Sequence, residues 1–317
     1  MSTATRTLDL HLASILIATD FSHASEKPLN HALAIARRFG AHFYVAHIVS
    51  ALGFAMAGPE ATCAAEDAVC HDASQLENEL AASGAFESLK HDFIIRDGRV
   101  WEEIERLIQE KSIDLLVIGT HGRRGMGKLL LGSTAEQIFR HAPCPVLTVG
   151  PGCYQEPRIE NTRPDRKFLF VTDFGQASLN ALPHAISFAN HFAASLALFH
   201  VMPVVLVPED FRVYTAADRD QMRKDLRAAS LQRLQQLVRT SPMKVEPEFV
   251  VEASSSSPVS EDILVAAEKI KADLIVMGLH RSTHVATASH LPWTTAYEVA
   301  CSAGCPVLTV RSAQSAA

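Results

Sequence analysis

The feature that most constrains the fold is a sequence pattern that occurs twice. Three pairs of segments match: TDFSHAS at 19–25 with TDFGQAS at 172–178, DLLVIGTH at 114–121 with DLIVMGLH at 273–280, and CPVLTV at 144–149 with the same letters at 305–310. The matches keep their order at offsets of 153, 159 and 161 residues. This period is too long for a solenoid, so it indicates a tandem duplication of one domain.

A chain of 317 residues is long enough for two such domains. Between the copies, residues 150–167 are rich in proline, glycine and charge and lack apolar periodicity, as is typical of a linker. We therefore expect a first domain at 1–150, a linker at 151–167 and a second domain at 168–317.

Each copy alternates short apolar runs with helical patterns. In the first copy we expect strands at 14–19, 42–48, 91–96, 114–118 and 146–149, and helices at 24–39, 64–83, 100–111 and 133–141. The second copy repeats this order, with strands at 168–172, 195–201, 245–251, 273–277 and 307–310, and helices at 178–192, 215–240, 260–270 and 295–302. Continuous Val, Ile and Leu runs between helices predict a parallel sheet that is covered on both faces. The expected fold is two doubly wound, Rossmann-like α/β domains of five strands each.

Composition excludes several classes of function. The formal charge of −6 offers no electrostatic basis for binding nucleic acid or an anionic membrane. No apolar run approaches the roughly 20 residues of a membrane span, and residues 1–11 lack the apolar core of a signal peptide. The six cysteines include no C-x-x-C motif, so neither a metal site nor a disulfide framework is expected. We expect a cytoplasmic protein with reduced thiols.

The most informative segment is GTHGRRGMGKLLLGST at 119–134, which follows an expected strand and leads into an expected helix. Glycines let backbone amides approach an oxyanion closely, and a helix N-terminus attracts negative charge. Ser133 and Glu136 also match a capping box, so Ser133 is either a helix cap or a phosphate ligand. Asp20 is likewise either a ligand or the cap of the next helix. A Walker A loop is disfavoured, because Leu129 stands where that motif needs Ser or Thr.

The spacing G-x2-G-x9-G-S, formed by Gly119, Gly122, Gly132 and Ser133, resembles the nucleotide signature of the universal stress protein family. The resemblance extends over both copies through the TDF segment, the strand that ends in glycine and the closing CPVLTV strand. It implies a stress-response regulatory protein that binds ATP, with or without Mg²⁺, in a sheet of strand order 3-2-1-4-5. In that order the first and fourth strands flank the change in winding direction, where open α/β sheets bind ligands.

The resemblance also implies the positions of the site. The aspartate after the first strand, Asp20, would contact the nucleoside, and the end of the second strand, near His47 and Ile48, would lie against adenine. The glycines and the hydroxyls that follow them would hold the phosphates. The full expected set is Thr19, Asp20, Ile48, Gly119, His121, Gly122, Gly132, Ser133 and Thr134.

The second copy lacks this signature. It keeps Asp173 and Gly278, but Arg281 stands at the second glycine and Trp293 at the third. Side chains there would obstruct a phosphate. We expect one nucleotide per chain, held by the first copy; the second is either a structural copy or a site for another ligand.

The sequence contains no catalytic constellation, and we expect no catalytic residue. Two alternatives to a nucleotide-binding regulator stay open: a weak ATPase, and an interaction or carrier protein without a nucleotide.

The closing strand CPVLTV is an edge strand in the expected order, and an open apolar edge promotes aggregation. We expect 146–149 to pair with 307–310, in the same chain as a pseudo-dimer of domains or in a homodimer.

Overall fold

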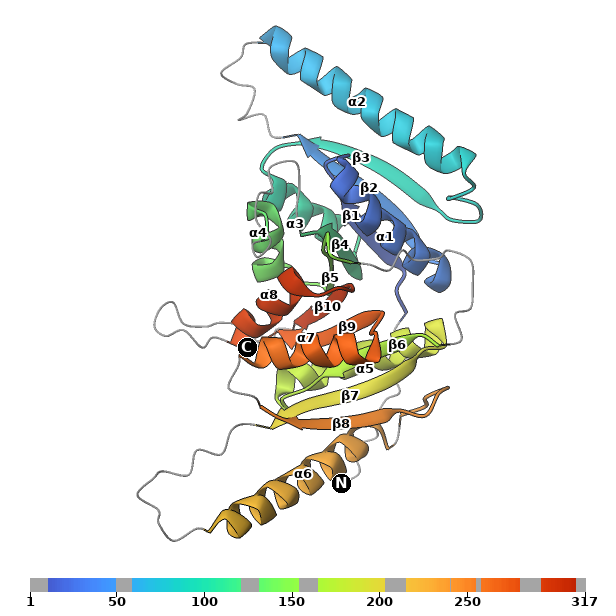
Figure 1. The fold of residues 1–317 in the computed structure, drawn as a ribbon. Helices are drawn as coiled ribbons and strands as arrows, with labels where there is room; N and C mark the ends of the chain where they lie inside the picture. The colour runs from blue at the N-terminus through green and yellow to red at the C-terminus, as the bar shows by residue number, and fades with distance from the viewer. Residues whose placement is uncertain are drawn as a thin grey trace. The chain divides into compact units, whose positions relative to one another are not determined.

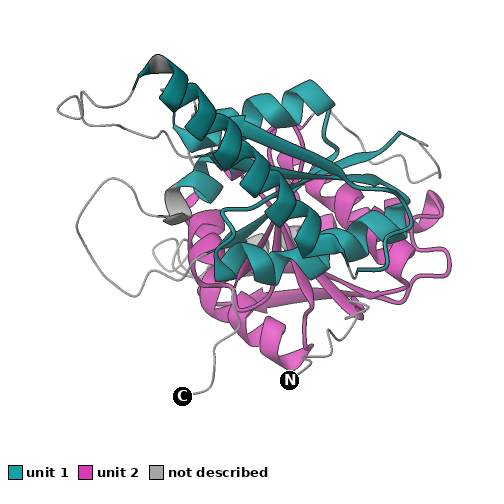
Figure 2. Cartoon of the chain, turned by 90° about the horizontal axis from the view of Figure 1, so that it is seen from below, with its two compact units in different colours: residues 1–10, 162–299 teal, residues 11–161, 300–317 magenta. Residues whose placement is uncertain are grey.

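The computed structural model describes residues 11–49, 59–120, 131–153, 165–202, 215–239, 241–254, 258–279 and 292–311. The chain forms two compact units (Figure 2). The N-terminal unit comprises residues 11–161 and 300–317, and the C-terminal unit comprises residues 162–299 with 1–10. These units are compact bodies, whereas the expected domains are copies of one sequence pattern. The expected domain limits therefore stay a prediction.

The N-terminal unit alternates strands and helices as expected (Figure 1). Its elements are β1 (Ser14–Ala18), a 3-10 turn (His23–Ser25), α1 (Glu26–Phe39), β2 (His42–Val49), α2 (Pro59–Ala82), β3 (His91–Asp97), α3 (Val100–Glu110), β4 (Leu115–Gly119), α4 (Ser133–His141) and β5 (Val146–Val149). Its strands follow the order β3-β2-β1-β4-β5, and β1 to β5 are parallel. The expected order 3-2-1-4-5 is confirmed for this copy.

The C-terminal unit repeats the arrangement. Its elements are β6 (Lys167–Val171), α5 (Gln176–Phe192), β7 (Ser195–Met202), α6 (Ala216–Val238), β8 (Glu248–Ala253), α7 (Val259–Ile270), β9 (Leu274–Leu279) and the larger part of α8 (Pro292–Ser302). The parallel strands follow the order β9-β6-β7-β8. The last strand of the second copy, β10 (Val307–Arg311), belongs to the N-terminal unit.

Strand β10 covers the edge of the first sheet. It pairs with β5 in antiparallel orientation, with Leu308 opposite Leu147. The Thr148 hydroxyl donates to the Val307 carbonyl, and the Thr309 hydroxyl donates to the Val146 carbonyl, both at 3.2 Å. The expected pairing of the two CPVLTV segments is therefore confirmed within one chain.

Apolar side chains explain why these elements pack as they do. Ile15, Leu16 and Ile17 on β1 are fully buried, as expected for a strand covered on both faces. On α1 the buried residues recur at helical spacing: Leu29, Ala32, Leu33 and Ala36. The helix ends at Gly40, whose φ of +65° is a left-handed conformation that glycine adopts without strain.

Six helix starts differ from the sequence expectation by one to five residues, and two of them have a cause that the sequence shows. Helix α2 begins at Pro59, five residues before the expected residue 64, because proline suits the first position of a helix. Helix α6 begins after Thr215, which forms a capping box with Asp218: the Thr215 hydroxyl accepts from the Asp218 amide at 3.2 Å.

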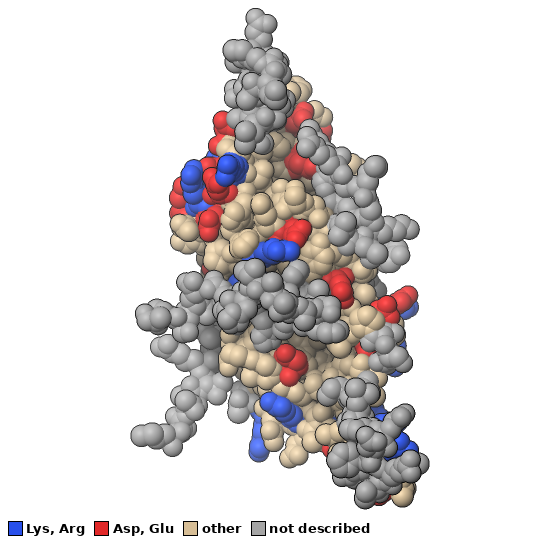
Figure 3. Space-filling model, turned by 90° about the vertical axis from the view of Figure 1, so that its left-hand side faces the viewer, with Lys and Arg blue, Asp and Glu red and all other residues tan. Residues whose placement is uncertain are grey.

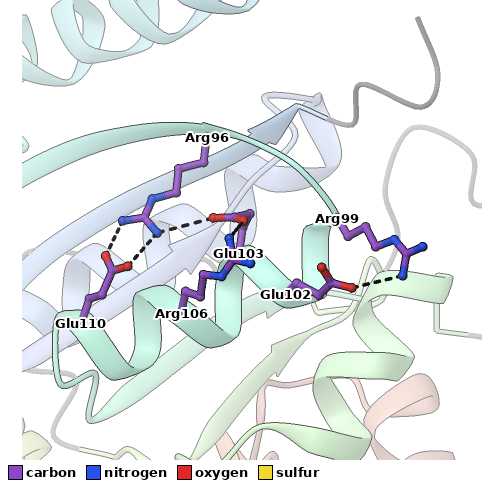
Figure 4. A network of polar contacts seen from close by, with 6 residues as sticks. All are labelled: Arg96, Arg99, Glu102, Glu103, Arg106 and Glu110. Carbon is purple, nitrogen blue, oxygen red and sulfur yellow. Dashed lines mark hydrogen bonds and ion pairs between the residues drawn. The ribbon is translucent and has the colours of Figure 1, made fainter. Parts of the chain in front are cut away.

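Strand β3 is tied to α3 by ion pairs (Figure 4). Arg96 on β3 pairs with Glu110 on α3, and its Nη1 also lies 3.5 Å from Glu103 Oε2. In the C-terminal unit, the corresponding positions of β8 and α7 hold Glu252 and Lys269, whose charged atoms are 3.4 Å apart. The strand-to-helix ion pair therefore occurs in both units with its charges reversed.

On the face shown in Figure 3, Lys and Arg side chains lie among Asp and Glu side chains. Within the described residues, no helix is both long enough and apolar enough to cross a membrane.

Candidate functional site

The candidate site lies where β1 and β4 end. The two strands are hydrogen-bonded neighbours, with Ala18 paired to Ile118, so Thr19 and Gly119 each follow directly at the same sheet edge. The amide of Gly132 donates to the Thr120 carbonyl at 3.0 Å, which fixes the start of α4 to the end of β4. The fold thus brings the loop after β1, the end of β4 and the first turn of α4 to one edge. The expected ligands His121 and Gly122 lie outside the described residues.

The carboxylate of Asp20 is held by its own loop. Its Oδ1 accepts hydrogen bonds from the Ser22 amide (3.0 Å), the Ser22 hydroxyl (2.6 Å) and the Ser25 hydroxyl (2.7 Å). Helix α1 begins at Glu26 after Ser25, without a side-chain cap. Asp20 therefore orders the turn ahead of α1 and does not cap that helix, and its carboxylate has a fixed orientation before any ligand arrives.

A stacked pair of rings supports the same loop. His47 Nδ1 lies 2.8 Å from the Thr19 carbonyl, to which it must donate, and the His47 ring stacks on Phe21 with centroids 4.8 Å apart. Phe21 has a φ of +56°, a strained conformation for a bulky side chain. The Phe21 amide donates to the Thr19 hydroxyl at 3.0 Å. The expected ligand Thr19 is thus part of the loop's internal bonding.

Successive side chains of a strand point to opposite faces of the sheet, so His47 and Ile48 on β2 do not face the same way. His47 faces the loop after β1, whereas the Ile48 side chain is buried. A contact between Ile48 and a ligand stays a prediction. Sequence reasoning missed Phe21, although its recurrence as Phe174 was a signal.

The second copy builds the same loop. The Asp173 Oδ1 accepts from the Gly175 amide and the Ser178 hydroxyl, both at 2.8 Å. His200 Nδ1 donates to the Thr172 carbonyl at 2.8 Å, and Phe174 has a φ of +61°. Both copies therefore keep this loop as part of the fold. Any difference in ligand binding between the two copies must come from residues outside the loop.

Two signature glycines have different physical explanations. A Cβ on Gly278 would overlap the backbone of Ala177 and Ser178, so the packing of α5 on β9 requires glycine there. Gly132 has an ordinary φ of −56°, and a Cβ there would lie 3.9 Å from the nearest atom, the Thr120 carbonyl oxygen. The described structure does not require glycine at position 132.

The expected capping box at Ser133 is wrong. Helix α4 begins at Ser133 itself, with Gly132 as its N-cap and no side-chain cap. The Glu136 carboxylate, which would complete the box, lies 2.6 Å from Arg140 Nη2 and pairs with it one turn later. Within the described residues, the hydroxyls of Ser133 and Thr134 have no assigned partner. The first turn of α4 thus offers backbone amides, two hydroxyls and the positive end of a helix dipole.

The corresponding helix of the second copy starts differently. Helix α8 begins at Pro292, two residues before the position that matches Ser133. Proline has no amide proton, and Trp293 follows it in the first turn. Position 281 lies outside the described residues. Within those residues, no cluster of His, Cys, Asp and Glu could hold a metal ion.

Comparison with known proteins agrees with the fold. The model of the universal stress protein family matches residues 12–150 and again 165–311. A universal stress protein of Methanocaldococcus jannaschii is 32% identical over 136 residues, which cover 43% of this chain and 80% of that protein.

Solved structures share the fold along most of the chain. A universal stress protein of Archaeoglobus fulgidus superposes with a TM-score of 0.61 at 20% identity, and the superposition covers 94% of this chain and 98% of that one. A Pseudomonas aeruginosa protein of unknown function superposes with a TM-score of 0.62 at 18% identity, covering 95% of this chain and 92% of the other. With the family model matched once in each repeat, the chain belongs to the universal stress protein family as a tandem, two-domain member.

Proposed function

We propose that the N-terminal repeat binds ATP, with or without Mg²⁺, and that the protein acts as a nucleotide-binding regulator in a stress response. The observation that carries this proposal is Gly132. The described structure leaves room for a side chain there, yet the residue is glycine and begins a helix that offers amides and two hydroxyls. A phosphate group at the α4 N-terminus would explain the glycine, because close approach of an anion to the backbone excludes a Cβ.

The opposite side of the site suits a nucleoside. The carboxylate of Asp20 is fixed by three donors on Oδ1 and follows β1 at the same sheet edge as Gly119. A carboxylate accepts hydrogen bonds from neutral hydroxyls, so Asp20 would bind the ribose. Thr19, Ile48 and Gly119 would line the nucleoside end, and His121, Gly122, Gly132, Ser133 and Thr134 the phosphates.

The proposal is tested on the full-length protein in two steps. Mass spectrometry of the denatured, purified protein identifies any nucleotide that co-purifies. Calorimetry on nucleotide-free protein then measures stoichiometry with ATP, for which we expect about one site per chain. A stoichiometry of two would contradict the assignment to the N-terminal repeat alone, and no measurable binding would contradict the function.

A further inference from the structure

Helix α6 extends beyond the sheet that it packs on. Its C-terminal half contacts the sheet through Leu234 and Val238, which are buried. All described side chains at 217–229 are exposed. An isolated helix of about 13 residues is marginal in water, so half of α6 lacks the packing that usually stabilises a helix (Figure 1).

The exposed half carries a stripe of three arginines. Arg219, Arg223 and Arg227 recur every fourth residue and therefore lie along one side of the helix. Among the described residues, no ion pair or hydrogen bond is assigned to any of the three side chains. Like charges at this spacing repel each other, so the stripe destabilises the helix unless something neutralises it.

Within the described part of α6, no acidic side chain forms an assigned ion pair with this stripe. The Asp218 carboxylate accepts from the Thr215 amide at 2.7 Å, and Asp225 accepts from Gln221 at 2.9 Å. Asp220 pairs with Lys224 at 3.0 Å. Each of the three carboxylates thus has a partner other than the stripe, and the three arginines are exposed.

Apolar side chains lie beside the arginines. Met222 and Leu226 are 45% and 41% exposed, and they are one turn apart on the adjoining face of α6. A charged stripe next to exposed apolar residues is typical of a helix surface that binds another protein.

The same chain contains a helix of opposite charge. Helix α2 occupies the matching place in the first repeat and has six acidic residues with no Lys or Arg. Without these six, the chain has 29 acidic and 29 basic residues, so α2 accounts for its whole formal excess of −6. Of the acidic residues of α2, Asp67, Asp72, Glu77 and Glu79 are exposed.

We propose that α6 of one chain binds α2 of a second copy of this chain. The two helices are nearly equal in length, at 23 and 24 residues, and opposite in charge. A two-fold dimer would use each pairing twice, α6 on α2 and α2 on α6, and would cover Met222 and Leu226 in both chains. This association is independent of nucleotide binding.

The test is a charge-swap experiment in full-length protein, monitored by sedimentation velocity over a concentration series at low and high salt. One variant reverses the stripe (Arg219→Glu, Arg223→Glu, Arg227→Glu), and the other reverses part of α2 (Asp67→Lys, Glu77→Lys, Glu79→Lys). We expect wild type to dimerise more weakly as salt rises, and each variant alone to have a dissociation constant raised at least about 100-fold. Lys90→Glu with Lys244→Glu and Lys271→Glu makes the same change in net charge as the stripe reversal, but elsewhere on the chain, and should leave dimerisation intact.

Mixing the two variants decides the identity of the partner. Because each variant then offers the charge that the other lacks, the mixture should form a dimer near wild-type affinity. A wild type that stays monomeric at every concentration overturns the proposal. So does dimerisation that survives reversal of the stripe, or a mixture of variants that stays dissociated; binding of the stripe to anionic vesicles in place of a second chain would count against it in the same way.

Discussion

Leu147 on β5 lies directly opposite Leu308 on β10, its own counterpart in the second repeat. The hydroxyls of Thr148 and Thr309 make matching hydrogen bonds across the same strand pair. The two strands are therefore related by a local two-fold symmetry, in which a surface pairs with its own copy. This explains why the CPVLTV segment is identical in the two repeats.

Placing like charges at this pair should be strongly destabilising. Leu147 and Leu308 are 1% and 0% exposed, so the double change Leu147→Lys with Leu308→Lys buries two positive charges against each other. We expect the free energy of unfolding to fall by at least about 4 kcal/mol, measured by urea denaturation, with dissociation of β10 from β5.

The double change Leu147→Met with Leu308→Met is the control, because it keeps volume and polarity and should cost less than about 1.5 kcal/mol per site. Unfolding free energies that match between the lysine and methionine pairs would show that the strands do not pair in solution.

Equivalent ion pairs of opposite polarity in the two units predict that the charges of Arg96 and Glu110 can be exchanged. Arg96 and Glu110 join β3 to α3 in the position where Glu252 and Lys269 join β8 to α7. Arg96→Glu breaks the partly exposed pair with Glu110 and also places a carboxylate beside the buried Glu103, so we expect it to cost about 1–3 kcal/mol. Adding Glu110→Lys, which copies the polarity of the second repeat, should recover about 0.5–1 kcal/mol of that loss in chemical denaturation. A double variant no more stable than Arg96→Glu would contradict the pairing.

The repeat made most of this fold predictable, because each strand and helix was expected twice from independent sequence. The start of α4 was not predictable in detail: Ser133 and Glu136 match a capping box by spacing, but Glu136 pairs with Arg140, a competition that spacing does not show. Likewise Gly119 and Gly278 are equivalent in sequence, and only the contact of Gly278 with Ala177 reveals that packing alone can require a glycine there. The support of the Asp20 loop by His47 joins residues 28 apart in sequence, which no local pattern reports.

The two kinds of glycine should respond differently to substitution. Gly132→Ala should change the unfolding free energy by no more than about 0.5 kcal/mol, because its φ and surroundings accept a Cβ. Gly278→Ala should destabilise by at least about 3 kcal/mol, because the new Cβ overlaps backbone. Thermal or urea unfolding of both variants measures the difference.

Although substitution of Gly132 should cost little stability, it should strongly weaken nucleotide binding. Gly132→Trp, which copies the residue of the second repeat, should raise the ATP dissociation constant by about 100-fold or more, because the phosphates lose amide hydrogen bonds. Unchanged ATP affinity in this variant, with its fold intact by circular dichroism, would exclude a phosphate site at α4.

A conservative change can separate the charge of Asp20 from its role in ordering the loop. Asp20→Asn keeps an oxygen that accepts from Ser22 and Ser25, so the loop should persist, but it loses the negative charge offered to the ribose. We expect about 10- to 100-fold weaker ATP binding by calorimetry. Asp173→Asn makes the same change in the second repeat and should leave ATP affinity as it is. Equal effects of the two changes would count against a nucleoside contact by Asp20.

His184 on α5 should make stability sensitive to acid. Burial lowers the pKa of its imidazole from 6.5 to about 4, and within the described residues its Nδ1 has no hydrogen-bond partner. Above pH 6.5 the ring is neutral in both the folded and unfolded chain, so it contributes no pH dependence. Between pH 6.5 and about 4 only the unfolded chain binds the proton, and the free energy of unfolding should fall by up to about 1.4 kcal/mol per pH unit. His184→Gln should remove about 3 kcal/mol of acid destabilisation over that window in urea titrations. Parallel pH profiles for wild type and His184→Gln would mean that the imidazole is hydrated in the native protein.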